Sequence, residues 1–169
     1  MRTIKVSNKI AIIDDGDFEV VNSHKWWLTK GGYAYTQVWM NKKKNTILMH
    51  RLIMQPKNGK EIDHINHDIL DNRRDNLRLC TRTQNNINRK SKNKTRGIRW
   101  TRNAWQAEIK NSGVYKYLGR YKNKEDALLA YDIAAKLVHG EFAILNNVTG
   151  REMITVQTNK VRDADLGGI

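Results

Sequence analysis

The chain has 169 residues, of which 39% are hydrophobic, so it can form one ordinary domain or two small ones but not a large core. Its 31 Lys and Arg against 17 Asp and Glu give a net charge of +14 and a pI near 10.0, which favours a polyanionic partner such as nucleic acid. No long apolar run accompanies this charge, so we expect no association with membranes.

The N-terminal segment MRTIKVSNKIAIID lacks the apolar stretch and the cleavage site of a signal peptide. Cys80 is the single cysteine, which excludes a four-cysteine structural zinc site. We therefore expect an intracellular, cytoplasmic protein with a reduced thiol and no structural zinc.

The first half of the chain changes character at its only proline, Pro56. Residues 1 to about 55 alternate apolar and polar positions over short runs, which predicts a small antiparallel β region. Residues 56–80 hold a dense cluster of Asp, His, Asn and Arg that no amphipathic period explains. Thr81 and Gln84 then form a capping-box pattern, which predicts a short helix to about Arg89.

The second half begins after a basic linker expected at 91–95. Short alternating runs predict strands at 97–100, 105–110 and 115–121, and three- and four-residue spacings of apolar residues predict a helix over 124–139. We expect residues 147–169 to form a tail. No acidic residue occurs between Asp75 and Glu108, whereas nine basic ones do, which indicates a positive surface for nucleic acid rather than an ordinary solvated face.

The segment around Asp63 and His64 has the residues that phosphodiester hydrolysis needs. A neutral imidazole accepts a proton near pH 7, so His64 is a candidate general base, with Asn76 as the polar neighbour that holds its ring or its backbone. The carboxylate of Asp63 and the side-chain oxygen of Asn85 are hard ligands that suit Mg²⁺, with Mn²⁺ as a substitute.

Four blocks of sequence resemble the HNH nucleases of ββα-metal fold, in particular the small homing endonucleases of phages and introns: MHRLI at 49–53, IDHIN at 62–66, DNRRDNLR at 71–78 and QNNIN at 84–88. The resemblance covers roughly residues 10–90. It implies that His64 is the general base, that Asp63 and Asn85 bind the metal, and that Asn76 orients the histidine. It also implies products with 5′-phosphate and 3′-hydroxyl ends.

Several assignments within these blocks stay open. The third HNH position is Asn85 or its neighbour Asn86, and we prefer Asn85. Asp71 and Asn72 fit a loop-shaping role better than a catalytic one. His67 is either a loop residue or close to the metal. His50 is equally well a packed strand residue or an active-site residue.

Residues 94–146 resemble the APETALA-two (ethylene-response-factor) DNA-binding domain through RGIRW at 96–100, WQAEI at 105–109, YLGRY at 117–121 and AYDIAA at 130–135. That family packs a three-stranded sheet on one helix and lays the outer face of the sheet in the major groove. Ile98, Ala107, Ile109 and Leu118 would then face the helix. Trp100 and Trp105 are equally candidates for core packing, while Asp132 and Asn146 are expected to support the fold.

Together these features predict an α+β chain: an HNH nuclease domain over 1–90, with its ββα-metal motif at about 48–90, and a DNA-binding domain over 96–146. The partner expected is double-stranded DNA, bound by a monomer or a weak homodimer. The alternative is a non-cutting, sequence-specific DNA-binding or regulatory protein; RNA binding is disfavoured by the lack of an aromatic-rich RNP pattern. The side chains expected at DNA are Arg51, Arg78, Arg82, Arg89, Arg96, Arg99, Trp100, Arg102, Lys110 and Tyr117.

Overall fold

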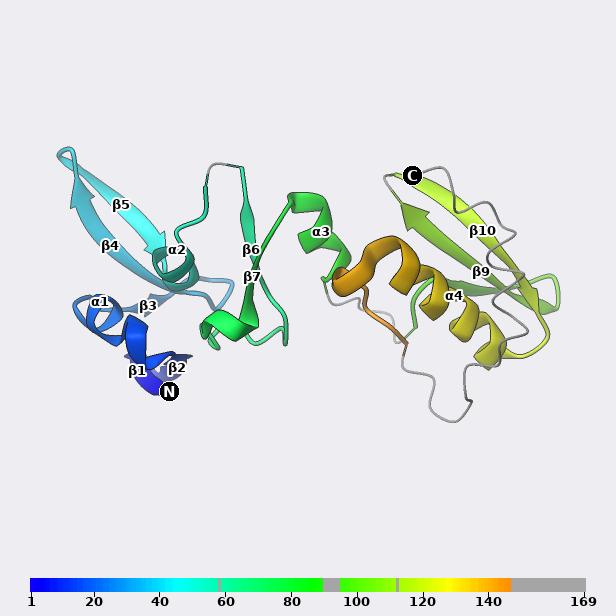
Figure 1. The fold of residues 1–169 in the computed structure, drawn as a ribbon, viewed down its shortest axis with the longest axis horizontal. Coiled ribbons are helices and arrows are strands. Elements are labelled where there is room, and N and C mark those ends of the chain that lie inside the picture. Colours follow the sequence, from blue (N-terminus) through cyan, green and yellow to red (C-terminus); the bar gives the residue numbers. More distant parts are fainter. Residues whose placement is uncertain (58, 90–94, 112, 147–169) are drawn as a thin grey trace. The chain divides into compact units, whose positions relative to one another are not determined.

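The computed structural model describes residues 1–57, 59–89, 95–111 and 113–146 (Figure 1). Over these residues the chain is α+β, with short helices and small sheets whose strands pair antiparallel, so the predicted class is confirmed at this level. Two compact units meet in sequence between Asn85 and Asn86. The linker expected at 91–95 lies outside the described residues apart from Thr95, as does all of the tail expected at 147–169.

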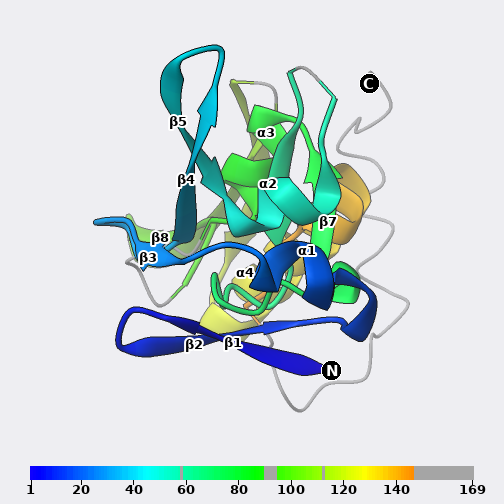
Figure 2. The same ribbon diagram turned by 90° about the vertical axis from the view of Figure 1, so that its left-hand side faces the viewer.

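The first unit begins with a hairpin of β1 (Arg2–Val6) and β2 (Lys9–Ile13). Side chains alternate across a strand, and here every second residue is buried, so Val6, Ala11 and Ile13 enter the core. A 3₁₀ turn, η1 (Asp15–Asp17), and the short helix α1 (Phe18–Asn22) follow. Figure 2 shows this hairpin as a separate layer at the N-terminal end of the unit.

A second sheet has the order β3 (Trp27–Leu28), β4 (Ala34–Met40) and β5 (Lys43–Leu48), and it leads directly into helix α2 (Met49–Met54). The prediction of a purely β region up to residue 55 is therefore wrong at α1 and α2. Each helix has fewer than two turns, too few for a helical period to show in the sequence. Burial of Met49 and Ile53, four residues apart on one face of α2, stabilises that helix.

The first unit continues with a hairpin of β6 (Glu61–His64) and β7 (Leu77–Cys80), with the 3₁₀ turn η2 (Arg74–Asn76) before β7. Helix α3 (Arg82–Ile87) begins in this unit and contains the boundary after Asn85. The predicted capping box is confirmed: the Thr81 amide donates to Gln84 Oε1 at 2.8 Å, and the Gln84 amide donates to Thr81 Oγ1 at 3.2 Å. Ile62 and Leu77 join the core formed by the earlier elements, which anchors this hairpin.

The second unit packs helix α4 (Lys124–His139) on a three-stranded sheet of β8 (Ile98–Thr101), β9 (Ala104–Asn111) and β10 (Val114–Tyr121), followed by η3 (Gly140–Phe142) (Figure 1). The strands and the helix agree with the predicted ones to within two residues. The core of this unit joins residues of the sheet to small residues of α4: Ala107, Ile109, Leu118, Ala127, Ala130, Ala134 and Ala135.

Candidate active site and nucleic-acid interface

Asp63 and His64 lie next to one another at the end of β6, where the strand pairs with β7. Asp63 is opposite Arg78 and His64 is opposite Leu77. Both side chains are buried, with 7% and 5% of their surface exposed. The core beneath the hairpin therefore holds a carboxylate and an imidazole in fixed positions, as a pre-organised site requires.

The Asp63 carboxylate is bonded to the guanidinium of Arg78. Nε and Nη2 of Arg78 donate to Asp63 Oδ2 at 2.9 and 2.8 Å, and both side chains are about nine-tenths buried. A buried carboxylate is stable only with such a partner or a metal, and Arg78 is that partner here. Arg78, expected at DNA, is thus turned toward Asp63.

Asn85 reaches β6 from helix α3. Its Nδ2 donates to Glu61 Oε2 at 2.7 Å. Glu61 and Asp63 are two residues apart on one strand, so they project to the same side of the hairpin. The carboxamide of Asn85 consequently lies on the side of β6 from which the Asp63 carboxylate projects, as the predicted metal site requires. The neighbouring Asn86 is exposed.

The imidazole of His64 belongs to a cluster with Tyr33 and His50. The ring centroid of His50 lies 5.2 Å from that of His64 at an interplanar angle of 89°, and the Tyr33 ring lies 6.0 Å from His64 and 5.5 Å from His50. His50 comes from helix α2, so it is a buried helical residue and not a strand residue. The three rings therefore form one aromatic cluster.

Burial holds both histidines in the neutral form. It lowers the pKa of His50 to about 3, with a further contribution from the charges of His64 and Arg51. Burial also lowers the pKa of His64, against the opposing effects of the nearby Asn72 carboxamide and the Asp63 carboxylate. Nε2 of His64 is buried and has no hydrogen-bond partner among the described residues. A neutral imidazole with an unused nitrogen is chemically able to accept a proton.

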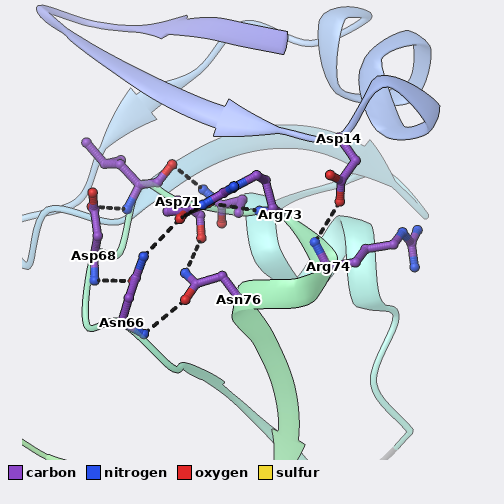
Figure 3. A network of polar contacts seen from close by, with 9 residues as sticks. Asp14, Asn66, Asp68, Asp71, Arg73, Arg74 and Asn76 are labelled. Carbon is purple, nitrogen blue, oxygen red and sulfur yellow. Dashed lines mark hydrogen bonds and ion pairs between the residues drawn. The ribbon is translucent and has the colours of Figure 1, made fainter. Parts of the chain in front are cut away.

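Asn76 holds the backbone that follows His64. Its Oδ1 accepts from the Asn66 amide at 2.9 Å, its Nδ2 donates to the Asp71 carbonyl at 2.7 Å, and its own carbonyl accepts from the Ile65 amide at 2.9 Å (Figure 3). The structure therefore brings Asn76 to the loop beside His64. Among the described residues, no hydrogen bond joins the side chain of Asn76 to the imidazole ring of His64.

The same loop is closed by two aspartate–arginine pairs. Asp71 accepts two bonds from Arg73, at 2.8 and 2.7 Å, and Asn66 Nδ2 donates to Asp71 Oδ2 at 2.9 Å (Figure 3). Arg74 bonds to Asp17 at 2.9 and 2.7 Å, which ties η2 to the N-terminal part of the unit. Asp71 thus has the loop-shaping role expected for it.

Asn72, for which the sequence favoured a loop-shaping role over a catalytic one, lies near His64. It is 1% exposed, and it bonds through its amide to Ile12 and through its Nδ2 to Leu70. Its Oδ1 is a second buried atom with no hydrogen-bond partner among the described residues. Its effect on the pKa of His64 indicates a place beside the ring. In the sequence, only the dense cluster of Asn and Asp around residue 72 could have indicated that Asn72 lies near His64.

The donors on this side of the hairpin suit a hard divalent cation. Asp63 provides a carboxylate and Asn85 a carboxamide, which are ligand types that Mg²⁺ accepts together with waters and phosphate oxygens. Over the described ranges, no three His, Cys, Asp or Glu side chains gather as a complete metal cage. A cation here would rely on ligands from water and substrate, as expected for a catalytic metal.

The outer face of the sheet in the second unit carries Arg99, Lys110 and Tyr117, all exposed. Arg99 is opposite Gln106, Lys110 is opposite Tyr115, and Tyr117 is opposite Glu108, which places these side chains away from α4. Tyr115, exposed at 64%, and Arg120 belong to the same face but were not among the residues predicted to contact DNA. Arg120 bonds to the carbonyls of Thr101 and Arg102.

Other expected DNA-contacting residues lie elsewhere in the second unit. Trp100 pairs with Trp105 and therefore lies on the opposite face from Arg99; the two indole rings meet edge to face at 5.2 Å. The guanidinium of Arg96 donates to the carbonyls of Ile87 and Arg89. Asn146 bonds to Asp132 and to the Arg96 amide, which agrees with a structural role. The remaining expected residues are exposed: Arg51, Arg82, Arg89 and Arg102.

Three comparisons bear on the family. The family model described as HNH endonuclease matches residues 48–87. A protein of Acanthamoeba polyphaga mimivirus, described as an uncharacterized HNH endonuclease, is 29% identical over 141 residues, which are 82% of this chain and 75% of that protein. Dehydration-responsive element-binding protein 2C of Arabidopsis thaliana is 39% identical over 71 residues, which are 39% of this chain but 21% of the plant protein.

A solved structure described as "DNA binding and cleavage by the HNH homing endonuclease I-HmuI" is also similar to this chain, with 27% sequence identity and a TM-score of 0.35. The match covers 38% of this chain and 40% of that chain, so less than half of either is compared. In the part of the chain that the structure describes, no helix has the length and apolar character needed to cross a membrane. Residues 48–87 thus match the HNH endonuclease model, and together with the viral relative this match supports a nuclease.

Proposed function

We propose that this nuclease is a metal-dependent endonuclease that hydrolyses phosphodiester bonds of double-stranded DNA, with His64 as the general base. The observation that carries the proposal is the pairing of a buried, neutral imidazole with the neighbouring Asp63 carboxylate on one hairpin. His64 accepts a proton from the attacking water, which makes the oxygen a better nucleophile toward the phosphorus.

In this proposal Asp63 and Asn85 hold one divalent cation, Mg²⁺ or in its place Mn²⁺. When bound, the cation supplies positive charge for the pentacovalent phosphorus and the departing 3′ oxygen. Arg78 shares the Asp63 carboxylate and keeps it oriented. Asn76 keeps the backbone after His64 in place, and this mechanism requires that the ring of His64 and the carboxylate of Asp63 act on the same phosphate.

The second unit supplies DNA affinity in our proposal. The outer face of β8–β10 would lie in the major groove, which admits a β-sheet edge or ribbon, with Arg99, Lys110 and Tyr117 as its contacts. Arg102, in the β8–β9 turn, and the exposed Arg51, Arg82 and Arg89 would meet the backbone, whereas Trp100 faces away from this surface. The likeness to dehydration-responsive element-binding protein 2C agrees with an APETALA-two-like domain in this chain, which we place at 96–146 from the resemblance of the motifs. A role in homing rests on the resemblance of the four motif blocks.

A plasmid-cleavage experiment tests the catalytic proposal. Wild type is incubated with supercoiled plasmid and Mg²⁺ or Mn²⁺, then with a chelator, and compared with His64→Ala and with His139→Ala as a matched histidine control in α4. We expect cutting by wild type and His139→Ala, no cutting with chelator, and a loss of about 10²- to 10⁴-fold for His64→Ala. Undiminished cutting by His64→Ala would refute the general-base assignment.

A binding experiment tests the second unit. Arg99→Ala and Lys110→Ala are compared with Lys136→Ala, an exposed lysine of α4 on the other side of the sheet. We expect the first two to weaken binding to duplex DNA by about tenfold each and the third to leave it near the wild-type value. Equal effects of all three would show that the outer face of the sheet is not the DNA surface.

A further inference from the structure

The β4–β5 hairpin is a two-stranded ribbon for most of its length. Strand β3 pairs with β4 only at Ala34 and Tyr35, so beyond those residues β4 and β5 pair with each other alone. Figures 1 and 2 both show this ribbon extending past the elements that surround its base. An isolated two-stranded ribbon is only marginally stable in water. The outer part of the β4–β5 ribbon has no covering layer, so forming the hydrophobic core does not explain its length.

The end of the ribbon exposes apolar and basic side chains together. Trp39 is 74% exposed and Met40 is 56% exposed, and both strands are exposed from Trp39 to Thr46. Directly across the ribbon, Lys44 is opposite Trp39 and Lys43 is opposite Met40. A single exposed Leu needs no explanation, whereas an exposed Trp beside an exposed Met and three consecutive lysines is typical of a binding surface.

The turn keeps a lysine at the tip at an energetic cost. Asn41 and Lys42 have φ angles of 51° and 60°, which is the two-residue turn that favours Asn-Gly. A lysine in place of glycine there is strained, and such strain is characteristic of functional sites. Asn45 Nδ2 donates to the carbonyls of Lys43 and Met40 at 3.1 and 3.5 Å, which stiffens the turn. The tip is thus a defined structure that presents positive charge.

The charge around the ribbon points to a polyanion. From Val20 to Lys60 the sequence contains no acidic residue and eight basic ones. One face of the ribbon presents Gln37, Trp39, Lys44 and Thr46, since residues directly opposite one another in a sheet share a face. These are groups that bond to base edges, contact thymine methyls and neutralise phosphates. A two-stranded β-ribbon also has the width of the major groove of B-DNA.

We propose that the β4–β5 ribbon is a second DNA-contacting element, inserted in a groove of the duplex with Trp39 toward the bases and Lys42, Lys43 and Lys44 at the phosphates. This inference rests on the proposed function, because it assigns a further contact with the DNA that the nuclease cuts. The ribbon would give the first unit its own contact with DNA, separate from the sheet of the second unit. A protein partner or a lipid surface at the same tip would leave DNA binding unchanged.

Fluorescence anisotropy of a labelled duplex tests the lysines, with the full chain carrying His64→Ala as the non-cutting parent. The triple variant Lys42→Gln/Lys43→Gln/Lys44→Gln is compared with Lys5→Gln/Lys9→Gln/Lys25→Gln, which removes the same charge from exposed positions of the same unit. We expect the ribbon variant to reduce the slope of log K against log salt concentration by about 2 to 3, near 0.9 for each phosphate contact, and the control by under about 1.

Trp39→Ala and Trp39→Phe test the aromatic contact. In the same parent, we expect Trp39→Ala to weaken binding by about tenfold and Trp39→Phe by less, because the phenyl ring keeps part of the apolar contact. The tryptophan fluorescence change on adding DNA should be smaller in Trp39→Phe than in the parent. Since residues 39–46 are exposed, the thermal unfolding of all these variants should match the parent.

The outcomes separate the two proposals. If the parent binds DNA but both triple variants give the same slope, and Trp39→Ala binds as the parent does, the ribbon is not a DNA contact and the proposed nuclease function stands. If the parent does not bind duplex DNA and wild type does not cut it, the proposed function fails and this inference fails with it. The inference is supported if the salt-dependence slope falls further in the lysine variant of the ribbon than in the control triple variant, and if the fluorescence change on adding DNA is smaller in Trp39→Phe than in the parent.

Discussion

Arg78 lies directly across the β6–β7 hairpin from Asp63, and its guanidinium donates two hydrogen bonds to a single oxygen of that carboxylate. The residue proposed to hold a metal is therefore already charge-balanced by a side chain of the same hairpin. A cation at Asp63 has to share the carboxylate with this arginine or displace it. The pair links the stability of the fold to occupancy of the proposed site.

Arg78→Ala should destabilise the protein and strengthen the binding of divalent cations. Removing one partner of a buried ion pair costs about 3 kcal/mol, because the other charge stays buried without that partner. A cation replaces the missing charge, so the midpoint of thermal unfolding should rise more with added Mn²⁺ in the variant than in wild type. Arg78→Lys, which keeps the charge, is the control. Equal shifts in Arg78→Ala and wild type would contradict the prediction.

Asn76→Ala should destabilise the loop after His64 by about 2 kcal/mol, because the partly buried amide of Asn66 and the buried carbonyl of Asp71 lose their hydrogen-bond partner. Asn76→Asp keeps the acceptor for the Asn66 amide but sets a carboxylate oxygen against the Asp71 carbonyl, so it should also destabilise the loop. Urea unfolding measures the stability, and plasmid cleavage measures the effect on His64. A variant that unfolds like wild type yet has lost cleavage would show that Asn76 acts on the chemistry directly and not through the loop.

The Asp71–Arg73 pair should make stability depend on pH in the acid range. The hydrogen bond from Arg73 lowers the pKa of Asp71 in the folded state, against the opposing effect of burial. A carboxyl whose folded pKa lies below its unfolded pKa contributes stability above the unfolded value, and that stability is lost as pH falls through the folded pKa.

Asp71→Asn tests this pair. We expect a loss of about 1 kcal/mol near neutral pH, a small value because Arg73 is 40% exposed and solvent screens the pair. Below the pKa of an ordinary aspartate, the unfolding free energy of the variant should fall less steeply with pH than that of wild type. Urea unfolding at several pH values measures both, and parallel curves for the two proteins would speak against the assignment.

Gly97→Ala should destabilise the second unit. Gly97 has a φ of +68°, and a Cβ there would lie 1.8 Å from the ring of Tyr131. The clash and the left-handed backbone together should cost about 3 kcal/mol or more. Gly113→Ala is a matched control, because its φ is +90° but nothing lies within 4 Å of the new Cβ, so it should cost about 1 kcal/mol. Thermal unfolding of the two variants should differ accordingly.

Much of the second unit could be predicted from local sequence, and less of the first. Strands β8–β10 and helix α4 have clear two- and 3.6-residue periods, and a capping box marks α3, so their positions follow from neighbouring residues. Helices α1 and α2 are too short for a period to show. Because His50 lies on α2, the cluster of three rings could not be predicted either.

The sequence by itself determined the positive charge, the Asp63–His64 pair and the class of chemistry, because these depend on which residues are present and in what order. Only the tertiary structure decided that Arg78 pairs with Asp63, that Asn72 lies by the ring of His64 while Asn76 holds the backbone, and that Trp100 shares a face with Trp105. Hydrogen-bond partners and strand faces depend on register between distant segments, and no local pattern of residues specifies that register.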